Sequence, residues 1–136
     1  LMVMFVSLHM LRVFLTGAYK PPRELNWIVG VILLVLTMLS SFTGYLLPWD
    51  QLAYWGVTIG CSMGENAPLL GAKGPFALLE SGKDVNSILV GGAAVGQPTL
   101  LRFYLLHAIA LPLGITGLMG FHFWRIRRAG GVSGPL

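Results

Sequence analysis

Two long stretches without a charged side chain constrain this chain more than any other feature. Residues Leu25–Trp49 and Phe103–Trp124 contain no Asp, Glu, Lys or Arg. Each exceeds the roughly 20 apolar residues that an α-helix needs to cross a bilayer core of about 30 Å. The 136 residues are 55% hydrophobic and only 10% charged, whereas a soluble domain carries about 25% charged residues. The sequence therefore predicts an all-α transmembrane protein and argues against a soluble globule, a disordered chain or a nucleic-acid binder.

A third apolar run, Leu1–Leu11, is too short to cross a bilayer by itself. It lacks the basic start and the small-residue cleavage site of a signal peptide. We expect residues 1–18 to be the second half of a spanning helix whose first half lies upstream of Leu1. The remaining predicted segments are a turn at 19–25, a spanning helix at 26–47, a loop at 48–101, a spanning helix at 102–128 and a tail at 129–136.

The loop at 48–101 is expected to contain some structure of its own. Its first part, Trp49–Val57, is rich in aromatic side chains and predicts a helix that lies in the membrane interface. Residues 60–98 are rich in Gly and Pro, which predicts turns and one short helix near Phe76–Ser81. The single cysteine, Cys61, excludes an internal disulfide and a Cys-based metal site within this chain. We expect it to be a small buried side chain.

The few charges predict an orientation in the membrane. The turn at 19–25 and the segment after the last span hold five basic residues against one acidic residue: Lys20, Arg23, Arg125, Arg127 and Arg128 against Glu24. The loop at 48–101 holds two lysines against four acidic residues. The positive-inside rule therefore places the basic side in the cytoplasm.

All three histidines, His9, His107 and His122, lie in predicted spanning helices. Ionisable groups within a membrane are costly and often functional, although a neutral imidazole can also bond to a neighbouring helix. The 15 residues between His107 and His122 correspond to about 60° around a helix and about 22 Å along it. This spacing lacks the short intervals of a zinc site. It suits two haem groups near opposite membrane faces, each held by one His from each of two helices.

Two glycines and one arginine are compatible with haem. Gly30 and Gly44 lie 14 residues apart, which places them about 40° apart around a helix. Such glycines allow either close helix packing or the approach of a flat porphyrin to the backbone. Arg12 follows His9 by three residues and shares its face. It can pair with a haem propionate or extend to the membrane interface.

Longer motifs resemble the cytochrome b family in its b6 form. The stretch Gly44–Gly56 resembles the end of the family's third helix and the surface helix that follows it. The stretches His9–Trp27 and Val95–His107 and the ending Arg127–Leu136 are closer to the b6 than to the mitochondrial form, as is the 15-residue histidine spacing. The resemblance covers nearly the whole chain except about residues 58–94. It implies part of a four-helix haem bundle, namely the end of helix B and helices C and D, with an interfacial loop between C and D.

The resemblance implies two haem b groups. His9 and His122 match the iron ligands of the haem near the cytoplasmic side. His107 matches a ligand of the haem near the opposite, positive side, and its partner His is expected upstream of Leu1. An additional covalent haem c, attached through a Cys outside this sequence, is also compatible with the family.

Other positions match residues around the cofactors and the quinol. Arg12 and Arg23 match basic residues that face the cytoplasmic-side haem, and Gly30 and Gly44 match glycines against which the macrocycles pack. The resemblance also implies a contribution to the quinol-oxidation pocket, for which the candidates are Tyr45, Pro48, Trp49 and Tyr54.

The implied function is that of a dihaem subunit in a quinol-oxidising Rieske/cytochrome b complex. Such a complex moves electrons across the membrane between quinol-oxidation and quinone-reduction sites and translocates protons. The implied partners are a Rieske iron–sulfur protein, a cytochrome c-type subunit, a subunit IV-like chain and a second copy of the complex in a homodimer.

Four possibilities remain open on the sequence. The divergent loop at 58–94 favours a menaquinol:cytochrome c reductase in a bacterial inner membrane. A plastoquinol cytochrome b6f complex in a thylakoid membrane is the alternative within the family. Outside it, the histidines also suit a dihaem anchor of a dehydrogenase or a helical membrane scaffold without haem.

Overall fold

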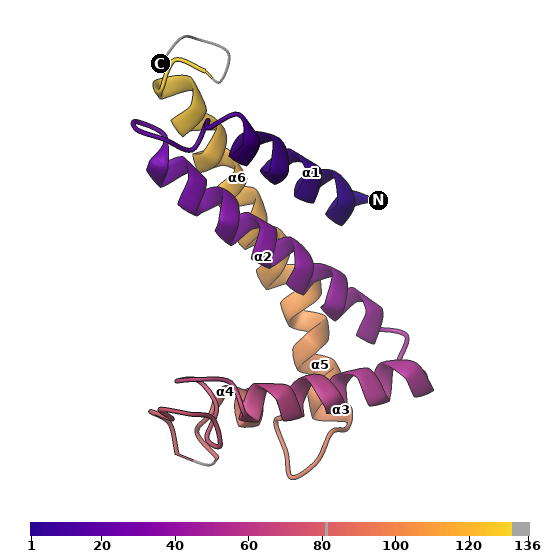
Figure 1. Cartoon of the computed structure of the whole chain (residues 1–136). Helices are drawn as coiled ribbons and strands as arrows, with labels where there is room; N and C mark the ends of the chain where they lie inside the picture. Colours follow the sequence, from indigo (N-terminus) through magenta and orange to yellow (C-terminus); the bar gives the residue numbers. More distant parts are fainter. Residues whose placement is uncertain (81, 132–136) are drawn as a thin grey trace. The chain divides into compact units, whose positions relative to one another are not determined.

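The chain forms a series of helices. The structure, a computed structural model, describes residues 1–80 and 82–131, and no strand occurs among them (Figure 1). This confirms the predicted all-α fold class. The helices are α1 (Met2–Leu15), α2 (Glu24–Leu46), α3 (Gln51–Glu65), α4 (Val85–Val90), α5 (Gln97–Leu105), the π-helical turn η1 (Leu106–Ala110) and α6 (Leu111–Arg128).

Among the described residues, two helical segments are long and apolar enough to cross a membrane. They are α2 and the continuous segment Gln97–Arg128, which contains α5, η1 and α6; the apolar helix α1 is shorter. Only 11% of the most apolar window of each long segment is buried within the chain. Their side chains therefore face surroundings other than this protein's own core, as expected for helices in contact with lipid, cofactors or further subunits.

The two long helical segments begin earlier in the chain than the predicted spans. The second predicted span, 26–47, corresponds to α2 at Glu24–Leu46, which begins two residues earlier with an acidic side chain in its first turn. A carboxylate there interacts favourably with the helix dipole. The third predicted span, 102–128, corresponds to a helical segment that already begins at Gln97. The predicted tail at 129–136 lies outside the described residues from position 132 onward.

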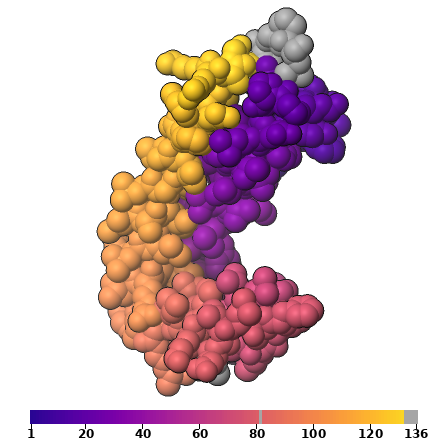
Figure 2. All heavy atoms as spheres, turned by 90° about the vertical axis from the view of Figure 1, so that its left-hand side faces the viewer, coloured from indigo at the N-terminus to yellow at the C-terminus, as the bar shows by residue number. Residues whose placement is uncertain are grey.

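The chain divides into two compact units, and each is described by itself. The first comprises residues 1–41 and the chain from Ala110 onward, and the second comprises residues 42–109. In the first unit, a Cβ placed on Gly30 of α2 would lie 3.6 Å from both the sulfur of Met10 in α1 and the Cε1 atom of His122 in α6. The three helices of this unit therefore meet at Gly30. In Figure 2 the atoms of the last turns of α6 lie against the N-terminal segment.

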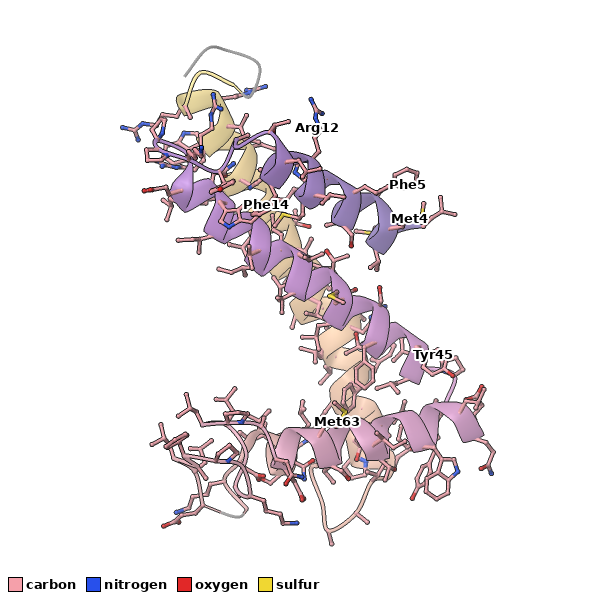
Figure 3. All side chains as sticks on the ribbon, viewed as in Figure 1. Met4, Phe5, Arg12, Phe14, Tyr45 and Met63 are labelled. Carbon is pink, nitrogen blue, oxygen red and sulfur yellow. The ribbon has the colours of Figure 1, made fainter. Side chains whose placement is uncertain are left out.

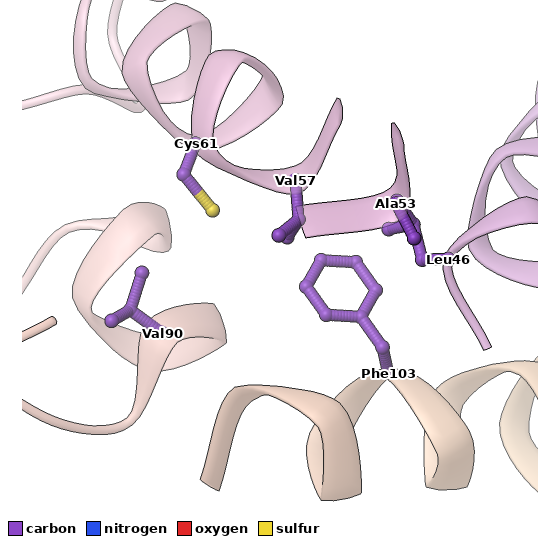
Figure 4. Packing of buried hydrophobic residues seen from close by; sticks show 6 residues of the cluster. All are labelled: Leu46, Ala53, Val57, Cys61, Val90 and Phe103. Carbon is purple, nitrogen blue, oxygen red and sulfur yellow. The ribbon is translucent and has the colours of Figure 1, made fainter. Parts of the chain in front are cut away.

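The core of the second unit is built on one face of α3. Ala53, Val57 and Cys61 recur at four-residue intervals, so they share a helix face, and all three are buried (Figure 4). They pack in one cluster with Leu46, Val90 and Phe103. Cys61 is thus a buried apolar-type side chain, as predicted. Burial, together with the nearby Glu65 carboxylate, raises the pKa of its thiol.

Polar contacts order the loop around this core. The Asp50 carboxylate accepts a hydrogen bond of 2.8 Å from the Ala53 N–H and caps α3. Near the other end of α3, Glu65 forms an ion pair of 2.6 Å with Lys73, and this raises the pKa of Lys73. The second carboxylate oxygen of Glu65 accepts a hydrogen bond of 2.8 Å from Asn86. Glu65 therefore ties two parts of the Gly- and Pro-rich loop to α3.

The short helix in the loop is not where the sequence predicted it. Among residues 76–80 no helix is present, and the expectation of one near Phe76–Ser81 is wrong for these described positions. The helix is α4, because both of its ends carry suitable signals. The Asp84 carboxylate accepts a hydrogen bond from the Ser87 N–H. The pKa of Asp84 is lowered mainly by the Ser87 side chain and further by this backbone hydrogen bond. At the other end Gly91 has φ 70°, a conformation that glycine adopts readily.

The helix that contains His107 changes its winding at η1. A proline, Pro112, follows this turn and has no N–H to donate to the carbonyl of residue 108. The regular α-helical hydrogen-bond pattern is interrupted there, and a wider turn accommodates the missing bond. Single π-turns of this kind are frequent at functional sites.

Replacing Phe103 by Ala should destabilise the second unit. Phe103 is only 3% exposed and contacts the core cluster, and such truncations cost about 3–5 kcal/mol through lost packing and the cavity left behind. The matched control is Phe76→Ala, since Phe76 is 85% exposed. Thermal unfolding in detergent should show a clearly lower Tm for the first variant only. Equal melting of both variants would contradict the assigned core.

Candidate functional site

A cavity in the first unit brings together two of the three histidines. His9 of α1 and His122 of α6 both line it, and Gly30 of α2 forms part of its wall. His122 is half-buried and His9 is exposed in the isolated chain. The absence of a side chain at Gly30 leaves the backbone of α2 accessible beside the imidazole of His122. The cavity therefore offers two nitrogen ligands from two helices and an open backbone in its wall.

The same cavity contains polar atoms that lack hydrogen-bond partners. Arg23 is 8% exposed, and its Nε atom has no partner in the described part of the chain. The same holds for Arg125 Nε, Asn26 Oδ1 and His122 Nδ1, all in residues that line the cavity. Buried polar atoms are normally paired, and each unpaired one requires an explanation. Two arginines beside two imidazoles suit a cofactor that carries both a metal ion and carboxylates.

This combination fits a haem. His9 and His122 would supply imidazole ligands for its iron, and the guanidinium groups of Arg23 and Arg125 would pair with its propionates. Gly30 leaves room for the macrocycle. Arg12, by contrast, is exposed, does not line the cavity, and projects away from α1 in Figure 3. The structure thus places Arg23, but not Arg12, next to the two histidines.

His107 lies in the second unit, next to the end of α2. Its Nδ1 atom is 2.9 Å from the hydroxyl oxygen of Thr43, which is fully buried. A Cβ placed on the neighbouring Gly44 would lie 2.8 Å from His107 Cε1 and 3.3 Å from Nε2. No side chain larger than hydrogen fits at Gly44 without displacing the ring. Thr43 and Gly44 together hold the imidazole of His107 against α2.

Two of the four quinol-pocket candidates lie together. Trp49 and Tyr54 pack edge to face at 6.2 Å between ring centroids, and both line an open depression with Asp50, Gln51 and Trp55. Tyr45 is 55% exposed, and neither Tyr45 nor Pro48 lines this depression. The side of α3 opposite the core carries an exposed apolar stripe formed by Leu52, Trp55, Ile59 and Met63.

Three residues of these sites were not recognised in the sequence. From the sequence, Arg125 is only one of the basic residues after the last span. Neither Asn26 nor Thr43 is a candidate site residue on the sequence alone. A polar residue within a spanning helix is a usable signal, because it needs a partner there. Thr43 gives this signal, because it is a polar residue within the predicted span 26–47.

The chain is similar in sequence to known proteins over its whole length. The sequence model of the family described as "Cytochrome b(N-terminal)/b6/petB" matches residues 1–135. The chain is 47% identical to the cytochrome b6 of Gracilaria tenuistipitata var. liui and 48% identical to that of Oltmannsiellopsis viridis, each over 136 residues. It is 46% identical to the cytochrome b6 of Acaryochloris marina (strain MBIC 11017) over the same length.

These matches include the whole chain but only part of each relative. In all three the aligned region is 100% of this chain and 58% of the relative. The family model covers almost every residue, including the loop at 58–94 that appeared divergent in the sequence. The chain belongs to the cytochrome b family, and within it to the N-terminal, b6-type region.

Proposed function

We propose that this chain is the haem-carrying b6-type subunit of a quinol-oxidising membrane complex. The observation that supports this most strongly is the cavity lined by His9, His122 and Gly30, with the unpaired atoms of Arg23 and Arg125 beside them. In this proposal His9 and His122 ligate the iron of a haem b on the cytoplasmic side. Arg23 and Arg125 bind its propionates, a role for which Arg12 is less suited because it lies outside the cavity.

A second haem b is proposed at His107. The partner His would come from a segment outside the given sequence. Gly44 lets the ring of His107 lie against the backbone of α2, because no group larger than hydrogen fits beside that ring. When bound, haem supplies one-electron transfer. Histidines would supply the protein ligands of the iron, which would favour electron transfer over oxygen chemistry.

The contribution of this chain to quinol oxidation is proposed at the start of α3. Trp49 and Tyr54 form an aromatic wall beside Asp50 and Gln51, which could contact a quinol ring and its hydroxyl groups. Tyr45 and Pro48 remain candidates from the sequence. The exposed apolar stripe on α3 suits a helix at the membrane interface, with the basic side of the chain in the cytoplasm.

The relatives favour a b6f-type complex over a menaquinol:cytochrome c reductase, since those named above are cytochrome b6 proteins. We therefore propose that quinol oxidation is coupled to proton translocation with a Rieske iron–sulfur protein, a cytochrome f- or c-type subunit and a subunit IV-like chain in a homodimeric complex. The membrane would be a thylakoid or a bacterial inner membrane. A covalent haem c would require a Cys outside this sequence.

Replacing His122 by Ala should remove the cytoplasmic-side haem and leave the other. The reason is that His9 alone cannot fill both axial positions of the iron. A reduced-minus-oxidised spectrum of the purified complex, with quantification as the pyridine haemochrome, should show about half of the wild-type haem b. Phe123→Ala, at an exposed neighbouring position, should retain both haems. Two haems in the His122→Ala variant would contradict the ligand assignment, and a colourless wild-type complex would favour a scaffold without haem.

A larger side chain at Gly30 should lower the haem content of the complex, but less completely than the loss of His122. The branches of Val at this position would extend into the cavity between Met10 and His122, because even a Cβ would already lie 3.6 Å from each. We expect Gly30→Val to lower the ratio of haem to protein. Gly114→Val is the control, since a Cβ on Gly114 meets no atom within 4 Å. Normal haem content in both variants would show that no macrocycle packs at Gly30.

A further inference from the structure

We propose that Thr43 is a positioning residue for the haem bound by His107, and that its hydroxyl sets the tautomer and basicity of that imidazole. This inference rests on the proposed function, because it presupposes that His107 ligates iron. Thr43 is fully buried, and its hydroxyl oxygen lies 2.9 Å from His107 Nδ1. The contact joins residues 64 positions apart, so it is a tertiary contact between α2 and η1.

The hydrogen bond leaves the other ring nitrogen for the metal. A neutral imidazole carries one proton, and the protonated nitrogen cannot bind iron. With the proton on Nδ1, the N–H donates to the Thr43 oxygen and the lone pair of Nε2 is free. Gly44 lies closest to Cε1, between the two ring nitrogens, because a Cβ there would be 3.3 Å from Nε2 and 3.4 Å from Nδ1. Thr43 and Gly44 are neighbours in sequence, and both lie against the same ring.

An acceptor for Nδ1–H also changes the electronic character of a ligand. It makes the imidazole more basic, and such partners of metal-binding histidines fix ring orientation and tune the metal. A more basic ligand stabilises the ferric state more than the ferrous state, so the bond should lower the midpoint potential of this haem. The effect should be confined to the haem at His107, because this is the histidine whose Nδ1 lies within hydrogen-bond distance of the Thr43 hydroxyl.

A second threonine on the same helix provides a matched control. Thr37 is also buried, at 6% exposed, but its hydroxyl donates a hydrogen bond of 2.8 Å to the carbonyl of Leu33, one turn earlier. Replacing it by Val removes the same hydroxyl from the same kind of environment without affecting a histidine. A change specific to Thr43 therefore cannot be attributed to the loss of a threonine from α2.

The test is a redox titration of the purified complex, followed by visible spectra of each haem, for the wild type, Thr43→Val, Thr43→Ser and Thr37→Val. We expect Thr43→Val to raise the midpoint potential of one haem only. A tenfold change in its reduction equilibrium corresponds to about 59 mV for one electron. Thr43→Ser retains a hydroxyl and should behave like the wild type, as should Thr37→Val. In Thr43→Val, the low-spin electron paramagnetic resonance signal of the haem whose potential rises should also change.

The outcomes separate this inference from the proposed function. An unchanged titration of Thr43→Val in a complex with two haems would overturn the role of Thr43 and leave the haem assignment intact. If Thr43→Val loses one haem altogether, retention of that haem in Thr43→Ser supports the inference, whereas its loss in both variants overturns it. Absence of haem from the wild-type complex would overturn the proposed function itself.

Discussion

The structure depends on one constraint, which is that polar ring nitrogens within apolar helices need partners. Three histidines lie on helices rich in exposed apolar side chains, where an unpaired polar group is costly. The chain itself satisfies only part of this need. Thr43 pairs with one nitrogen of His107, while His122 Nδ1 and two arginine Nε atoms accept or donate no hydrogen bond within residues 1–80 and 82–131. A metal-containing, carboxylate-bearing cofactor would supply partners for the histidine nitrogens that face it and for the arginines.

Small residues make this arrangement possible. Gly30 lies where α1, α2 and α6 meet, and Gly44 lies against the ring of His107. A methyl group at Gly44 would collide with the imidazole, so glycine is required there for packing alone. At Gly30 a methyl group would make only ordinary contacts. Space for a macrocycle is therefore the stronger explanation for glycine at position 30, and ring packing is a sufficient one at position 44.

The helical fold could be predicted from the sequence because uncharged runs such as Leu25–Trp49 have few other solutions. The histidines were recognised for a similar reason, since an imidazole is conspicuous in an apolar helix. Contacts that depend on side-chain direction could not be predicted. Arg12 and Arg125 were both basic residues near a helix end, and only the fold shows that the second lines the cavity. The π-turn at His107 could not be predicted either. The angle between two residues is derived from the sequence at 100° per residue, which assumes a uniform α-helix.

The central claim is that His9 and His122 of this chain ligate one iron. The most direct test is an experimental density map of the purified complex at a resolution that shows side chains. We expect density for a haem in the cavity at Gly30, held by His9 and His122, with Arg23 and Arg125 beside its carboxylates. Lipid or protein side chains filling that cavity, or a haem ligated by other residues, would contradict it.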